Sequence, residues 1–161
     1  MRRILLLLGL AAALAMPVAV SAAGGTDGTL SVKRGHATIV LKLRGTVIGR
    51  LASGTVRMRD LNPYDNSIPQ VRHCRTLRYP NPLTAVCTGK KLVFRAVDGR
   101  FQARLKGSGI YFSAVGRGSV TVQGTGSPSL SNGVMSLDNA PYQPIPDLLT
   151  TYPLGSSSSR L

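Results

Sequence analysis

Two cysteines and two histidines are the residues in this sequence best suited to chemistry. His73 directly precedes Cys74, while Cys87 and His36 lie elsewhere. Adjacent ligands chelate a metal ion poorly and the chain has no CxxC pair, so we expect no metal site. In an exported chain, two cysteines are typical of a disulfide. We therefore predict a Cys74–Cys87 disulfide that stabilises the fold by roughly 3 kcal/mol by closing a short loop.

The residues that would support catalysis are few. The chain contains no Glu, and all six acidic residues are Asp, which excludes a glutamate acid/base pair. His36 falls on a predicted turn and His73 lies beside the predicted disulfide, so neither is placed for a catalytic triad. The serines of residues 107–109 and 118–120 lack the GxSxG pattern of a nucleophile elbow. We predict no catalytic residues and no cofactor, with an atypical hydrolase as the remaining enzymatic alternative.

The first 22 residues have the features of a signal peptide. Arg2 and Arg3 precede an uncharged apolar run at 4–15, and small residues follow Pro17. The apolar run is shorter than the roughly 20 residues that span a bilayer. We expect an exported protein, secreted or envelope-associated in a bacterium, with no transmembrane segment after cleavage. Residues 23–27 would form a short linker.

Composition limits the remaining chain to one small basic domain. The full sequence has 20 Lys and Arg against 6 acids, a net charge of +14. A GC-rich bacterial genome would also explain the Arg excess. Eighteen Gly without any Glu argue against helices. Residues 28–153 are long enough for a single domain but not two, and we expect residues 154–161 to be a disordered tail.

Alternation of apolar and polar residues predicts strands joined by tight turns. Asp98-Gly99 lies between two alternating runs, the strongest local signal for a hairpin. A two-residue turn there would pair Ala96 with Phe101 and place the apolar side chains on one face. The same reasoning predicts hairpins at residues 34–35, 53–54 and 116–118.

Further strands are expected near residues 134–137 and, at a sheet edge, near residues 149–152. Many short antiparallel strands with Gly turns favour an all-β fold: a β-sandwich or partly open barrel built from hairpins. A recurring Gly-Thr/Ser-apolar pattern leaves a short β-solenoid as the alternative, although its spacing is not constant.

The predicted registers direct many cations outward. The hairpins would place Arg50 opposite Arg57 and Lys91 opposite Lys106, which costs up to roughly 1 kcal/mol for each like-charge pair. That cost favours a polyanion as partner, whereas solubility and edge protection are the alternative explanation. The candidate polyanion-binding residues are Lys42, Arg44, Arg50, Arg57, Arg59, Lys91, Arg95, Arg104 and Lys106.

Residues 60–90 form a second candidate surface. This segment shows little strand pattern, contains four prolines, and would be held by the disulfide. Its aromatic and arginine side chains are of the kind that dominate interfaces, although a constrained insertion without a ligand has the same features. The candidate contacts are Tyr64, Arg72, Arg75, Arg78 and Tyr79.

These observations predict a non-enzymatic binding or structural domain that associates with an anionic envelope polymer or polysaccharide through a basic sheet face. The alternative is a secreted protein-binding or inhibitor module that uses the loop 60–90. Few aromatic residues and no Trp disfavour nucleic acid, because the stacking platforms are missing.

Overall fold

The computed structural model describes residues 26–65, 67–126 and 131–155, and the predicted leader lies outside them. Two long strands dominate the fold, and five short ones accompany them. The strands are β1 (Gly28–Asp60), β2 (Gln70–Arg72), β3 (Thr76–Asn81), β4 (Thr84–Gly124), β5 (Val134–Leu137), β6 (Gln143–Pro144) and β7 (Thr150–Leu154).

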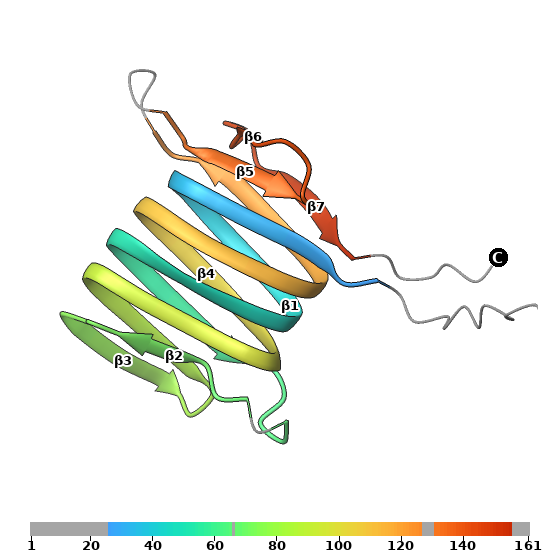
Figure 1. Ribbon diagram of the computed structural model, residues 1–161. Coiled ribbons are helices and arrows are strands. Elements are labelled where there is room, and N and C mark those ends of the chain that lie inside the picture. Colours follow the sequence, from blue (N-terminus) through green and yellow to red (C-terminus); the bar gives the residue numbers. More distant parts are fainter. Residues whose placement is uncertain (1–25, 66, 127–130, 156–161) are drawn as a thin grey trace, which may run out of the picture.

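Strands β1 and β4 wind around a common axis as a stack of turns (Figure 1). Successive turns of the stack come alternately from the two strands, which run antiparallel. Ile39 of β1, for example, pairs with Leu105 on one side and with Val122, seventeen residues further along β4, on the other. Each central turn is therefore hydrogen-bonded on both edges. All seven strands belong to one antiparallel sheet, which is not closed into a barrel.

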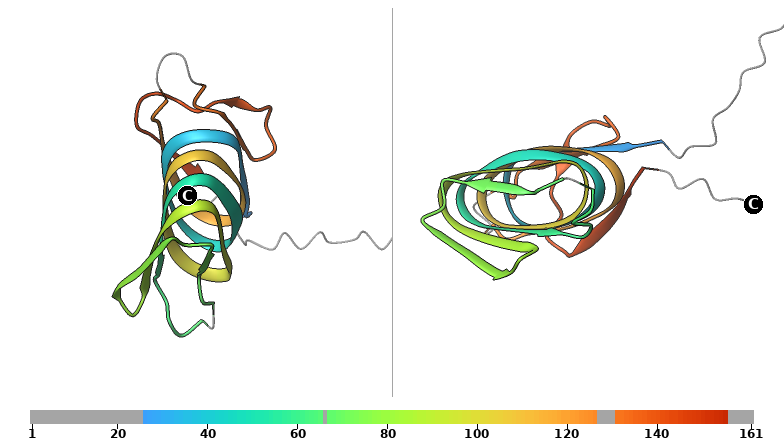
Figure 2. Two further views of the ribbon diagram at one scale, coloured as in Figure 1. Left: turned by 90° about the vertical axis from the view of Figure 1, so that its left-hand side faces the viewer. Right: turned by 90° about the horizontal axis from the view of Figure 1, so that it is seen from below.

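The coil is flattened, so that the winding sheet presents two broad faces (Figure 2). Pairing across the first face follows Tyr152, Val120, Leu41, Ala103, Met58 and Ala85, with β7 at one edge and β3 at the other. Pairing across the second face follows Val71, Phe94, Gly49, Phe112, Val32 and Met135, from β2 to β5. The inward side chains of both faces form one shared core.

Glycines lie where the chain passes from one face to the other. Pairing brings Gly45 between Gly99 and Gly116, and Gly54 between Gly89 and Gly107. At Gly54, φ is +143° and a Cβ atom would overlap the carbonyl oxygen of Lys106. Glycine therefore allows both the unusual backbone conformation and the close approach of neighbouring turns.

The core follows from strict side-chain alternation. Leu92, Phe94 and Ala96 are buried while the intervening residues are exposed. Phe94 and Phe112 reach toward each other from the two turns that flank Gly49, with ring centroids 6.3 Å apart. A Cβ on Gly49 would lie only 2.5 Å from Phe94 Cζ, so the missing side chain makes room for these two rings.

The all-β fold with an antiparallel sheet is confirmed, but the predicted hairpin partners are wrong. Strand β4 runs through Asp98 and Gly99 without reversing, so Ala96 pairs with Val47, and Phe101 with Leu43. Strand β1 likewise continues through residues 34–35 and 53–54, and β4 through 116–118. Asp98 does adopt a positive φ of 51°. The turn signal therefore marks a corner of the coil. There β1 pairs on one side at Gly45, and the connection before β2 lies on the other, where Ser67 Oγ donates to the Val97 carbonyl.

The shorter elements are closer to expectation. Strand β5 has the predicted bounds, and β7 pairs with β4 at the edge of the first face. Leu154, the first residue of the expected tail, is the buried end of β7, while residues 156–161 lie outside the described part. Residues 60–90 contain more strand than expected, because β2, β3 and the start of β4 all fall within them.

The corner glycines generate the first prediction. In the variant G54A, the added methyl group would meet the Lys106 carbonyl and lie 2.8 Å from Gly107 Cα. We expect a loss of at least about 2 kcal/mol in the free energy of unfolding, from strain and steric overlap together. Chemical denaturation measures it, with A52S, a change at an exposed residue of the same turn, as the control. Equal stability of the two variants would contradict the tight corner.

Candidate anion-binding face

The nine predicted polyanion-binding residues are all exposed, but they do not lie on one surface. Six of them are outward on the first face. Arg50 and Arg95 are outward on the second face, and Lys91 lies at a corner with a positive φ of 53°. The six residues of the first face are Lys42, Arg44, Arg57, Arg59, Arg104 and Lys106.

Three more arginines complete this surface. Arg100 and Arg117 lie opposite Arg44 on its two sides, and Arg78 of β3 lies two positions from Arg57 across the sheet, beyond Val86. Sequence alternation already predicts that Arg100 points outward. Arg78 and Arg117 could be assigned to this face only from the strand pairing, which no local sequence pattern predicts. We call these nine residues the cationic face: Lys42, Arg44, Arg57, Arg59, Arg78, Arg100, Arg104, Lys106 and Arg117.

Like charges meet on the cationic face, although not in the predicted pairs. Arg50 lies opposite Val93 and Tyr111, and Lys106 lies opposite Thr38 and Thr55, so both predicted like-charge pairs are wrong. The hairpin registers on which they rested do not form. The observed like-charge neighbours are Arg57 with Arg104, and Arg44 with both Arg100 and Arg117.

Acidic residues do little to neutralise this surface. No Asp occupies an outward position on the described strands of the cationic face. The one ion pair among the described residues joins Arg117 Nε to Asp27 Oδ1 at 2.9 Å, at the border of the face. Asp98 lies near the same corner, where it lines a pocket with Asp27, Arg44 and Arg117. Most of the face therefore carries uncompensated positive charge.

The second face has a different chemistry. Exposed aliphatic side chains such as Ile48 and Val97 lie among its cations. Two of these cations cover tyrosine rings: Arg50 lies over Tyr111 at 5.0 Å from the ring centroid, and Lys33 lies over Tyr142 at 4.1 Å. The hydrogen bond from Lys33 lowers the pKa of the Tyr142 hydroxyl. We call this surface the mixed face.

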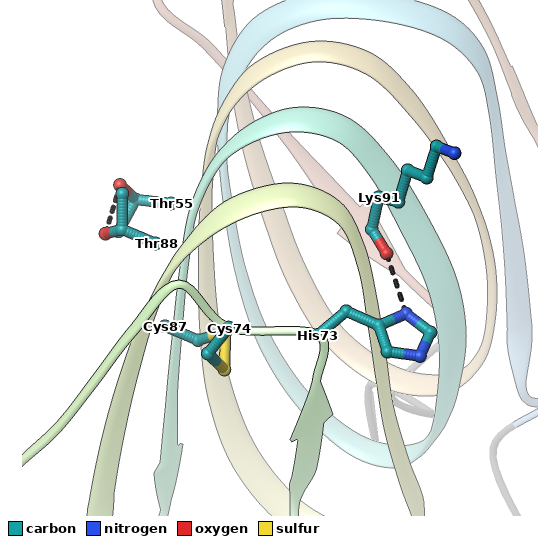
Figure 3. Close-up of a disulfide and its surroundings, with 6 residues drawn as sticks. All are labelled: Thr55, His73, Cys74, Cys87, Thr88 and Lys91. Carbon is teal, nitrogen blue, oxygen red and sulfur yellow. Dashed lines mark hydrogen bonds between the residues drawn. A yellow bond between two sulfur atoms is a disulfide. The ribbon is translucent and has the colours of Figure 1, made fainter.

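The predicted disulfide is confirmed. Cys74 and Cys87 are bonded, and they join the segment between β2 and β3 to the first turn of β4 (Figure 3). Beside the bond, His73 Nδ1 lies 3.0 Å from the carbonyl oxygen of Lys91, and the hydroxyls of Thr55 and Thr88 lie 3.0 Å apart. The disulfide and the His73 contact hold the connection before β3 against the coil, and the Thr55–Thr88 contact joins β1 to β4 beside them.

The end of the coil between β2 and β3 contains a groove of about 580 Å³. Its surface is polar and apolar in equal measure: Ile68 and Leu77, which are exposed, line it together with Asp60 and Arg72. Thr84, which is 1% exposed, also lines the groove, and its hydroxyl has no hydrogen-bond partner among the described residues. This end therefore combines an open groove with a buried polar atom that lacks a partner among the described residues.

The predicted loop contacts are distributed over several surfaces. Arg72 and Tyr79 line the end groove, and Arg78 belongs to the cationic face. Arg75 lines a separate depression beside the disulfide. Tyr64 is 91% exposed in the connection from β1 to β2. The segment 60–90 thus contributes to more than one surface.

The described residues reveal no other recognisable centre. Within them, no three His, Cys, Asp or Glu side chains gather where they could hold a metal ion, and no helix is long and apolar enough to cross a membrane. No protein-family model, curated protein or solved structure matches the chain. The candidate function therefore rests on the surfaces themselves.

The tyrosine contact on the mixed face can be tested directly. Replacing Lys33 in the variant K33M removes both the hydrogen bond and the positive charge that favour the tyrosinate form, so the pKa of Tyr142 should rise. The measurement is a tyrosinate absorbance titration of wild-type protein and K33M, each compared with its Y142F derivative. An unchanged pKa would show that Lys33 does not engage this hydroxyl.

The disulfide should stabilise one end of the molecule more than the rest. In C74A/C87A we expect a loss of about 3 kcal/mol in the free energy of unfolding, the value for a loop of this length. Hydrogen exchange should show reduced protection in β2 and β3, with amides at residues 101–105 protected up to the global unfolding limit. Uniform loss of protection along β1 and β4 would contradict this local role.

Proposed function

We propose that this chain is an exported, non-enzymatic binding protein that uses the cationic face to hold an extended anionic polymer of the cell envelope. The observation that carries the proposal is the clustering of nine cations on one side of a flattened sheet, several of them directly opposite one another on neighbouring turns. Such neighbours cost up to roughly 1 kcal/mol per pair in the free protein. A bound polyanion would relieve that repulsion.

The alternative explanations account less well for this distribution. Edge protection requires charges on the outermost strands. Lys42, Arg57 and Arg104, however, lie in turns paired on both sides. Solubility requires net charge, but it does not require that cations gather on one face while the other exposes aliphatic side chains.

The shape and composition of the face favour an extended polymer. Outward side chains repeat at about 7 Å along a strand and about 5 Å between neighbouring turns, which forms a flat lattice of charges. The described outward positions of this face include no aromatic residue, so the stacking on which single-stranded nucleic-acid binding relies is missing. Anionic wall polymers or acidic polysaccharides fit these properties better, and the disulfide is in keeping with an oxidising compartment.

Two double variants with equal changes in charge test the proposal. R57E/R104E reverses neighbouring charges on the cationic face, and R50E/R95E reverses two on the mixed face. Binding of the purified domain to isolated cell envelopes, measured by co-sedimentation across a salt series, should fall on the order of tenfold or more for the first variant only. Wild-type binding should weaken steeply with salt. Equal losses in both variants, or no binding at low salt, would refute the proposal.

A second candidate function is protein binding at the end of the coil. The specific observation is the groove between β2 and β3, which exposes apolar side chains beside polar ones, together with the unsatisfied Thr84 hydroxyl. With this function the chain would be a protein-binding or inhibitor module and not a polymer-binding protein. Because the disulfide lies at that end, C74A/C87A should impair such an interaction far more than salt-dependent polymer binding, to which β3 contributes Arg78 alone.

A further inference from the structure

Within the cationic face, four side chains surround one small depression. Arg57 and Arg59 are successive outward residues of β1, and the turn of β4 beside them places Arg104 opposite Arg57 and Gln102 opposite Arg59. These four residues line a depression of about 170 Å³. The sheet register therefore fixes the Cα atoms of three arginines and one glutamine at the corners of a rectangle with sides of about 5 and 7 Å, and their side chains meet over one depression.

The charge of this cluster is not neutralised by the protein. Among the described residues, none of the three arginines makes a side-chain hydrogen bond or an ion pair, and no acid lines the depression. Asp60 follows Arg59, but it lines the end groove instead, and its carboxylate accepts a hydrogen bond from the backbone N–H of Asn62 at 2.8 Å. Three guanidinium forks are thus available at one place.

A second group of three arginines on the same face differs in this respect. Arg44, Arg100 and Arg117 are also neighbours across the sheet. Their corner, however, contains Asp27 and Asp98, and Asp27 is paired with Arg117. Two groups of equal formal charge therefore lie on one face, and only the first lacks acids. This contrast provides an internal control.

The number of donors indicates the kind of anion. A carboxylate has two oxygens and is satisfied by one or two guanidinium forks. A phosphate or sulfate group offers three or more oxygens around a tetrahedral centre and can accept from all three arginines. We infer that Arg57, Arg59, Gln102 and Arg104 form a subsite for one tetrahedral oxyanion, a phosphate or sulfate group carried by the bound polymer.

This inference rests on the proposed function but goes further, because a general polyanion surface would not distinguish anions by shape. The probes are polyphosphate, a sulfated dextran and polyglutamate, compared at equal ionic strength and charge concentration. Wild-type protein should bind the phosphate or sulfate polymer on the order of tenfold more tightly than the carboxylate polymer. Comparing the first two polymers identifies which oxyanion the site prefers.

Three triple variants decide the assignment. In R57Q/R59Q/R104Q the preference for tetrahedral anions should disappear. In R44Q/R100Q/R117Q, with the same loss of charge, all three polymers should bind more weakly by a similar factor and the preference should remain. R57K/R59K/R104K keeps the charge but not the planar fork, so it should keep the salt dependence and lose the preference.

The outcomes separate the two proposals. If wild-type protein binds all three polymers equally, or if R57Q/R59Q/R104Q retains the preference, the subsite is refuted while the polymer-binding function stands. If no polymer binds at low salt, the proposed function itself fails. Thermal unfolding of each variant verifies that the sheet is intact, and a variant that has unfolded is replaced by the corresponding single substitutions, among which R57Q and R104Q should each reduce the preference.

Discussion

The close approach of backbones at the corner glycines is the constraint on which the rest of the structure depends. At Gly45 and Gly54, the chain passes from one face to the other directly beside a glycine of the neighbouring turn. Any side chain there would push the two turns apart and break the hydrogen bonds between them. Because these corners are tight, β1 and β4 can continue for 33 and 41 residues instead of ending in loops.

Tight corners also explain why the molecule has two distinct surfaces. A flattened coil directs alternate residues of each half-turn into a shared core, and the remaining ones to one of two opposite sides. The chemistry of each side is therefore set by outward residues from segments far apart in the sequence, such as Arg57 and Arg104. One side combines arginine and lysine with threonine, serine and glutamine, and the other combines cations with tyrosine and aliphatic residues. The separation of these two chemistries is a consequence of the winding.

The sequence was sufficient to predict which side chains are buried, but not which segments are neighbours. Alternation identified Ala96 and Phe101 as inward and Arg95 and Arg104 as outward, because both properties depend only on the local period of two. The hairpin at Asp98-Gly99 failed since a positive φ at a polar residue before glycine suits a corner as well as a reversal. Only pairing between β1 and β4 distinguishes them, and at this corner it joins residues more than forty positions apart, such as Gly45 and Gly99.

Because strand pairing could not be predicted, the residues of the candidate site were also grouped incorrectly. Outward cations could be recognised individually, yet Arg50 and Arg95 were grouped with Arg57 and Arg104 because the assumed hairpins placed them together. The true register moves the first two to the opposite side and brings Arg78 and Arg117 to the cationic face. In the observed register, like charges still lie opposite one another, in turns that are paired with a neighbouring turn on both sides. Charges at the centre of a sheet cannot prevent pairing at its edges. The central position of these arginines therefore supports the proposed ligand rather than protection of the sheet edges.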